Sequence, residues 1–185
     1  TGGNNIAISR ALKENFDYVM LLNNDTKVNS DFLSFLVRRL ENENKLGAIQ
    51  PLILQMDDKN KIWNAGGSFI RLIGLSNVVD KGKNIKSINL NKHYSEWISG
   101  CCIMLKSKVI REVGLLDNSF FAYFEDVDWS LTKILSPIDK EIESKVSGAP
   151  VNKSVILTVV DNLQGFLLGD SFNWSYFILV LINLF

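Results

Sequence analysis

Short apolar runs alternate with amphipathic stretches along most of the chain. Residues 18–22 form a continuous apolar run between polar neighbours, which is typical of a strand buried on both faces. Apolar positions recur at helical spacing on either side of this run. They predict one helix capped by Asn4 or Asn5 and a second capped at Ser30-Asp31. This alternation predicts an α/β domain with a mostly parallel sheet and flanking helices.

Weaker patterns predict the remaining elements. Gly2 and Gly3 indicate a turn before the first helix, and Gly114 ends a short helix further along. Residues 80–95 are polar and rich in Lys and Asn, so we expect a loop there, with His93 as a solvated loop residue. The other predicted strands span residues 47–54, 61–67, 69–75 and 97–105, and the short helix spans residues 107–113.

The last fifteen residues form an uncharged apolar run. Trp174 and Tyr176 lie at one end of residues 171–185, and Asp170 is the last charged residue. As a helix the run would be about 22 Å long, short of a hydrocarbon core of roughly 30 Å. A clipped membrane span, an interfacial helix and a core helix all fit, and the first two together are favoured. We therefore expect an apolar helix associated with a membrane surface.

Composition and charge narrow the class of protein. The 185 residues suit one domain, and 46% hydrophobic against 22% charged residues permits a folded core. Twenty basic and twenty acidic side chains balance, which removes the electrostatic argument for binding nucleic acid. Cys101 and Cys102 are neighbours that bridge poorly, so we expect buried thiols and a reducing compartment. That favours a cytoplasmic location, including the cytoplasmic face of a membrane.

The polar cluster that follows residues 18–22 is the first candidate site. Asn23, Asn24 and Asp25 come where a strand ends, and ligands of α/β sheets gather at that end of the strands. Their oxygens are hard ligands suited to Mg²⁺ or Mn²⁺, which could then hold a diphosphate. Taken alone, the residues favour a plain strand-to-helix turn. A calcium-binding EF-hand is excluded, because Lys27 takes a ligand position and the required glycine is missing.

Three carboxylates that follow an aromatic stretch form the second candidate site. Glu125, Asp126 and Asp128 come directly after residues 120–124. An apolar environment makes a carboxylate a competent general base. The same residues suit the first turn of a helix that runs through Leu135. Both interpretations hold together, because a base at a helix start is held rigidly.

A third candidate site lies at residues 97–102. Trp97 could stack on a sugar ring, and Gly100 would let a ligand or a loop approach the backbone. On their own, these residues favour a core strand with a glycine bulge.

The order of these motifs resembles a known family. The chain reads Gly-Gly-Asn-Asn at residues 2–5, Leu-Leu-Asn-Asn-Asp-Thr at 21–26, Trp-Ile-Ser-Gly-Cys at 97–101 and Phe-Glu-Asp-Val-Asp-Trp at 124–129. It is similar to the family 2 inverting glycosyltransferases, most closely to the rhamnosyltransferase-like branch, over about residues 1–135. The resemblance implies a Rossmann-like GT-A fold and a nucleotide-diphosphate sugar donor. It also implies a glycan or lipid-linked acceptor.

The resemblance also implies roles for single residues. Asp25 matches the metal ligand of the family's Asp-x-Asp motif, for Mg²⁺ or Mn²⁺. Asp126 matches the base that deprotonates the acceptor hydroxyl, with Glu125 and Asp128 in support. The residues that match the substrate-binding stretches and the rest of the motif are Gly3, Asn5, Asn23, Asn24, Trp97 and Gly100.

Three departures from the family pattern stand out. Asn23 replaces the first Asp of the metal motif, which leaves Asp25 as the main ligand. The family's first strands should precede Thr1, so we expect a GT-A fold incomplete at the N-terminus. Ser144 stands where a His is expected before residues 145–148, which puts a second metal or phosphate contact in doubt.

We therefore divide the chain into a partial GT-A catalytic region at residues 1–135, a divergent connecting segment at 136–170 and the apolar helix at 171–185. Two other functions fit the same features. One is a catalytically inactive remnant that still binds sugar nucleotides. The other is a membrane-associated structural piece.

Overall fold

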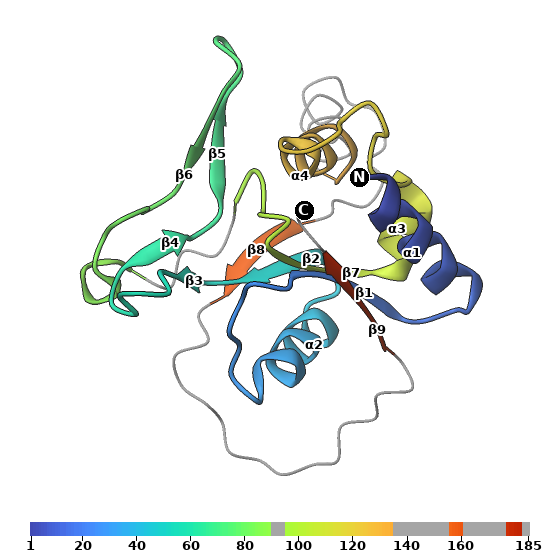
Figure 1. The fold of residues 1–185 in the computed structure, drawn as a ribbon, viewed down its shortest axis with the longest axis horizontal. Helices are drawn as coiled ribbons and strands as arrows, with labels where there is room; N and C mark the ends of the chain where they lie inside the picture. The colour runs from blue at the N-terminus through green and yellow to red at the C-terminus, as the bar shows by residue number, and fades with distance from the viewer. Residues whose placement is uncertain (90–94, 135–155, 161–176, 183–185) are drawn as a thin grey trace, which may run out of the picture.

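A five-stranded sheet forms the centre of the protein (Figure 1). The computed structural model describes residues 1–89, 95–134, 156–160 and 177–182. In spatial order the strands are β8 (Ile156–Val160), β2 (Leu46–Pro51), β7 (Cys102–Lys106), β1 (Tyr18–Asn23) and β9 (Phe177–Ile182).

The sheet is mixed rather than mostly parallel. Strand β9 runs parallel to β1 and β8 runs parallel to β2, but β7 is antiparallel to both β1 and β2. The chain leaves β2 and returns to the same end of the sheet at β7, which is the path of an antiparallel connection. The α/β class is confirmed, and the expectation of a mostly parallel sheet is wrong, because β7 pairs antiparallel with both of its neighbours. As a result, the start of β7 lies beside the end of β1.

Helices cover both faces of this sheet (Figure 1). Side chains alternate along β1, so Val19 and Leu21 pack with α1 and α3 while Met20 and Leu22 pack with α2. The continuous apolar run is thus buried on both faces, as predicted. The three helices are α1 (Gly2–Lys13), α2 (Phe32–Asn42) and α3 (Ser107–Val113).

Two small antiparallel sheets extend from the end of β2, and the outer one projects away from the body as a hairpin (Figure 1). The indole of Trp97 packs on this hairpin at Gly67, where an added Cβ would lie only 1.7 Å from Trp97 Cε2. Trp97 Nε1 also donates a hydrogen bond to the Ser68 carbonyl at 3.2 Å. The small strands are β3 (Ile53–Leu54) paired with β4 (Ile62–Asn64), and β5 (Gly67–Ile70) paired with β6 (Leu75–Val78).

A helix follows the aromatic stretch, as predicted. Helix α4 (Glu125–Asp128) continues directly as a π-helical segment, η2 (Trp129–Ile134). Trp129 anchors it, because the indole is 1% exposed and Nε1 donates to the Gly114 carbonyl at 3.0 Å.

The observed boundaries of several elements differ from the predicted ones. The first helix already begins at Gly2, so Gly2 and Gly3 are helical and do not form the expected turn. The strand expected at residues 97–105 begins only at Cys102, because side-chain hydrogen bonds hold the preceding residues in an irregular loop. The expected loop at residues 80–95 contains a short 3-10 helix, η1 (Ile85–Ser87).

The apolar C-terminal helix is also a wrong prediction where the structure describes it. Phe177–Ile182 forms strand β9, which pairs with β1. A run of aromatic, branched and aliphatic residues without a polar face suits a buried strand as well as a helix. Within the described parts of the chain, no helix has the length and apolar character needed to cross a membrane. His93, Ser144 and residues 145–148 lie outside the described residues.

Candidate active site

The turn after β1 carries the first predicted site. Asp25 is exposed there and Asn23 is half-buried. The Thr26 hydroxyl donates to the Asn23 carbonyl at 2.8 Å and closes the turn. The turn interpretation is therefore confirmed, and the closed turn leaves the Asp25 carboxylate in solvent at the strand end, where its role as a metal ligand stays a prediction.

The loop before β7 lies next to this turn. The Asn23 N–H donates to the Cys101 carbonyl at 2.9 Å, which continues the pairing of β1 with β7. This contact brings residues 23–25 and 98–101 together at one end of the sheet.

The third motif joins them through the carboxylate of Asp126. Asp126 Oδ2 accepts a hydrogen bond from the Gly100 N–H at 2.8 Å, and Oδ1 accepts one from the Val127 N–H at 2.8 Å. An added Cβ at Gly100 would be 3.6 Å from Asp126 Oδ2, an ordinary contact distance, so the carboxylate is bound to this residue by the hydrogen bond and the contact does not require a glycine. Two backbone donors thus fix the orientation of the predicted base.

A set of buried polar side chains that the sequence did not reveal holds the loop in place. Gln50 is fully buried, and its Oε1 accepts from the Ser99 N–H at 2.6 Å. Its Nε2 donates to Asn64 Oδ1 at 2.9 Å, which connects the loop to β4. The one available signal was a glutamine inside an otherwise apolar strand, because a buried amide requires partners.

Ser130 ties the same loop to the helix that carries the carboxylates. Its hydroxyl donates to the Asp126 carbonyl at 2.7 Å and accepts from the Ile98 N–H at 3.3 Å. The loop is therefore held from β2 on one side and from α4 and η2 on the other.

Cys101 connects the two predicted motifs through the backbone, because its carbonyl accepts from the Asn23 N–H and the preceding Gly100 N–H donates to Asp126. Burial raises the pKa of its thiol to about 11, and the negative charges of Asp25 and Asp126 add to the rise. The backbone contacts of Gly100 and Cys101 bring the turn after β1 and the Asp126 carboxylate to the same end of the sheet. The neighbouring Cys102 is buried, burial raises the pKa of its thiol to about 12, and neither cysteine forms a disulfide.

The two flanking carboxylates differ in their surroundings. Glu125 Oε2 is buried and accepts no hydrogen bond from a residue that the structure describes. Asp128 Oδ1 accepts from the Thr132 hydroxyl at 3.0 Å, which secures the helix. Glu125 Oε2 is thus a buried acceptor without a partner among the described residues, next to Asp126 in the chain.

The aromatic stretch does not enclose these carboxylates as expected. Phe121 is 94% exposed and Tyr123 is 79% exposed. Tyr123 and Phe124 both have left-handed backbone angles, with φ of 66° and 64°. Bulky residues rarely adopt this conformation, and strain of this kind collects at functional sites.

A cleft of about 650 Å³ opens beside the first motif. Asn23, Asp25 and Cys101 form one wall, and the β3–β4 hairpin forms another. This volume is within the usual range of small-molecule sites. The cleft gives a substrate direct access to Asp25.

The donor set at this site fits a divalent cation that binds together with a substrate. Asp25 offers one exposed carboxylate, and Asn23 and Asn24 add amide groups in the same turn. Over the described residues, no group of three or more His, Cys, Asp and Glu side chains is placed to hold a metal alone. Mg²⁺ commonly binds through one or two carboxylates plus substrate phosphates, which matches this sparse set.

Three predicted site residues contact other parts of the fold. Trp97 is buried against the β5–β6 hairpin and does not line the cleft. Gly3 and Asn5 lie in α1, where Asn5 Nδ2 donates to the Leu116 carbonyl at 2.8 Å. Packing alone accounts for Trp97 and Asn5, and their roles toward a substrate stay predictions.

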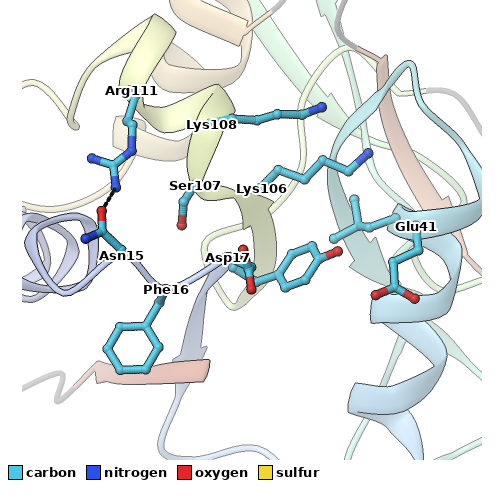
Figure 2. Close-up of a pocket in the computed structure, with 10 residues that line it drawn as sticks. Asn15, Phe16, Asp17, Glu41, Lys106, Ser107, Lys108 and Arg111 are labelled. Atoms are coloured by element: carbon cyan, nitrogen blue, oxygen red, sulfur yellow. Dashed lines mark hydrogen bonds between the residues drawn. The ribbon is translucent and has the colours of Figure 1, made fainter. Parts of the chain in front are cut away.

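Figure 2 shows a second cavity, of about 570 Å³, at the opposite end of β1 and β7. Lys106 Nζ donates to the Glu43 carbonyl at 3.1 Å, and burial lowers the pKa of this ammonium. Arg111 donates to Asn15 Oδ1 at 3.2 Å. None of the predicted site residues lines this cavity.

Comparison with known proteins gives one informative match. No family model matches the chain. Over 133 residues the chain is 30% identical to the low-salt glycan biosynthesis hexosyltransferase Agl10 of Haloferax volcanii. The match covers 70% of this chain and 41% of that protein, so the chain spans less than half the length of this curated relative.

Proposed function

We propose that this chain forms the catalytic part of a glycosyltransferase. In this proposal a sugar moves, with inversion, from a nucleotide-diphosphate donor to a glycan or lipid-linked acceptor. One observation carries it: the turn after β1 and Asp126, distant in sequence, meet at residues 100–101, where the Cys101 carbonyl accepts from the Asn23 N–H and the Gly100 N–H donates to Asp126. The likeness to a hexosyltransferase supports sugar transfer, and the order of the motifs supports family 2 and its rhamnosyltransferase-like branch.

Asp126 acts as the general base in this mechanism. Its carboxylate, held by the Gly100 and Val127 N–H groups, takes the proton from the acceptor hydroxyl. The hydroxyl oxygen forms a bond to the anomeric carbon while the bond from that carbon to the diphosphate oxygen breaks on the opposite face. A positioned base of this kind contributes roughly 10²–10⁴ in rate.

Asp25 is the residue that would hold Mg²⁺ or Mn²⁺. When bound, the cation supplies positive charge that stabilises the leaving diphosphate. Glu125 and Asp128 support the base from the same helix start, where Asp128 Oδ1 accepts from the Thr132 hydroxyl. The remaining proposed substrate contacts are Gly3, Asn5, Asn23, Asn24, Trp97 and Gly100.

The same proposal places the protein in the cytoplasm or at the cytoplasmic face of a membrane, where two free thiols are stable. A membrane surface is then a further partner, in line with a lipid-linked acceptor.

A transfer assay tests the proposal. The protein that contains this chain is incubated with Mn²⁺ and a panel of nucleotide-diphosphate sugars, and release of the nucleoside diphosphate is measured with and without a mixture of glycan acceptors. We expect release with at least one donor that depends on both metal and acceptor. Binding without release would favour the inactive remnant, and absence of binding to every donor would contradict the proposal.

A further inference from the structure

The far wall of the cleft beside Asp25 is formed by the β3–β4 hairpin. In β4, Ile62 and Asn64 point inward and are buried, whereas Trp63 is on the opposite face, 40% exposed, and lines the cleft. Asn64 Oδ1 accepts from Gln50 Nε2 at 2.9 Å and from the Gly66 N–H at 2.7 Å. The strand that carries Trp63 is therefore fixed to the core, which makes the indole a rigid platform.

Other apolar side chains line the same cleft as Trp63. A flat aromatic face that is partly exposed inside a cleft packs well on the apolar C–H face of a sugar ring. The apolar neighbours include Val28, Phe32, Ile53 and Met56.

The charges of the cleft favour an anion. Two lysines line the cleft: Lys27 lies in the turn after β1, and Lys59 lies in the connection between β3 and β4. Both are exposed, and neither forms an ion pair or hydrogen bond with a residue that the structure describes. Among the described residues that line the cleft, Asp25 is the sole acidic one. A concave site with excess positive charge concentrates anionic ligands.

We propose that this cleft is the acceptor subsite for a sugar that carries an anionic group, with its ring on Trp63 and its charge near Lys59 and Lys27. This inference rests on the proposed transferase function and names the chemical class of its acceptor. Asp126 does not line the cleft, but Cys101 borders it and directly follows Gly100, whose N–H donates to Asp126. The cleft therefore adjoins the loop that holds the proposed base.

Binding of small probes tests this inference without transfer. Ligand-observed NMR is used to measure the affinities of glucose 1-phosphate, glucuronate, glucose and inorganic phosphate for the protein. We expect the two anionic sugars to bind about tenfold more tightly than glucose or phosphate, because ring and charge act together. The two anionic probes distinguish a phosphate from a carboxylate as the recognised group.

Matched variants assign the contacts. Trp63→Ala should lower the affinity of the protein for both anionic sugars about tenfold, and Trp63→Phe should keep most of that affinity. Lys59→Gln should remove the preference for the anionic sugars over glucose. Lys45→Gln serves as the control, because Lys45 is exposed just before β2, at the opposite end of that strand. None of these variants should change metal-dependent binding of UDP, measured in parallel by calorimetry.

Two results would overturn the inference. One is the absence of a preference for anionic sugars in the unmodified protein. The other is a loss of UDP affinity in Trp63→Ala and Lys59→Gln with sugar binding intact, which would assign the cleft to the donor. If the protein binds anionic sugars but none of the nucleotide-diphosphate sugars of the transfer assay, the anionic-sugar site stands, and its assignment as an acceptor subsite falls together with the proposed transferase function.

Discussion

The Asp126 carboxylate receives hydrogen bonds from two backbone N–H groups and belongs to a helix start, so its position does not depend on flexible neighbours. Asp126→Asn keeps the size of the side chain and removes its ability to take a proton. We expect turnover to fall roughly 10²–10⁴-fold while donor affinity stays within about twofold. Steady-state kinetics with calorimetric donor titration measure the two effects.

Glu125→Gln and Asp128→Asn are the matched controls for this prediction. Each removes one carboxylate from the same helix start, and each should cost less turnover than Asp126→Asn. A larger loss in either control, with near-normal turnover in Asp126→Asn, would move the role of base to that residue.

The ionisation of the Cys101 thiol tests whether the carboxylates of both motifs lie near it. Only the thiolate reacts with iodoacetamide, and burial together with Asp25 and Asp126 raises the pKa of this thiol to about 11. The labelling rate should therefore rise only as the pH approaches about 11, against an ordinary thiol pKa near 9. Mass spectrometry identifies the labelled cysteine.

Asp25→Asn and Asp126→Asn should each lower the pH midpoint of Cys101 labelling, because each removes a negative charge that disfavours the thiolate. Burial is the larger cause, so the midpoint should stay above that of a free thiol. An unchanged midpoint in both variants would show that the two carboxylates do not face Cys101.

The sequence predicted the charged residues of the site, but not the residues whose hydrogen bonds position the site. Asp25 and Asp126 were predicted because acidic residues at a strand end and a helix start form recognisable patterns. Gln50 and Ser99 were missed because their hydrogen bond joins residues 49 positions apart. No local pattern carries information about such a contact.

At the level of elements, the positions of strands and helices were predicted better than their directions. Strand β1 and helices α2 and α3 agree with the hydrophobic pattern, since each buries a periodic set of side chains. The antiparallel direction of β7 depends on how the hairpins at residues 53–78 lead the chain back to the sheet, which periodicity does not encode. A run such as residues 177–182 has no polar face, so its pattern alone does not separate helix from strand.

The packing of Trp97 on Gly67 makes a stability prediction for the β5–β6 hairpin. Gly67→Ala would place a methyl group 1.7 Å from Trp97 Cε2, so the indole or the hairpin must shift. Overpacking of this kind typically costs about 1–3 kcal/mol. Urea denaturation measures the free energy of unfolding.

Gly2→Ala is the control for this substitution. No atom lies within 4 Å of a Cβ added at Gly2, and the residue is in helix α1. The change should leave the free energy of unfolding the same or raise it by up to about 1 kcal/mol. Equal stability of both variants would contradict the packing of Trp97 on Gly67.

For the whole molecule, the site depends on three segments that meet at one end of the sheet. Residues 23–25 follow β1, residues 98–101 precede β7, and residues 125–128 begin a helix on one face. Because β7 is antiparallel to β1, its first residues lie beside the last residue of β1. The site therefore depends on the strand direction that the sequence did not predict.

Calorimetric titration of the protein with UDP, in the presence and absence of Mn²⁺, tests the central claim most directly. The account predicts that Mn²⁺ increases the affinity for UDP at least about tenfold, since a carboxylate-bound cation pairs with the diphosphate. Asp25→Asn should abolish this increase, whereas Asp57→Asn, at an exposed position, should leave it unchanged. Equal stimulation by Mn²⁺ in the Asp25→Asn variant and the unmodified protein would reduce Asp25 to a turn residue and contradict the account.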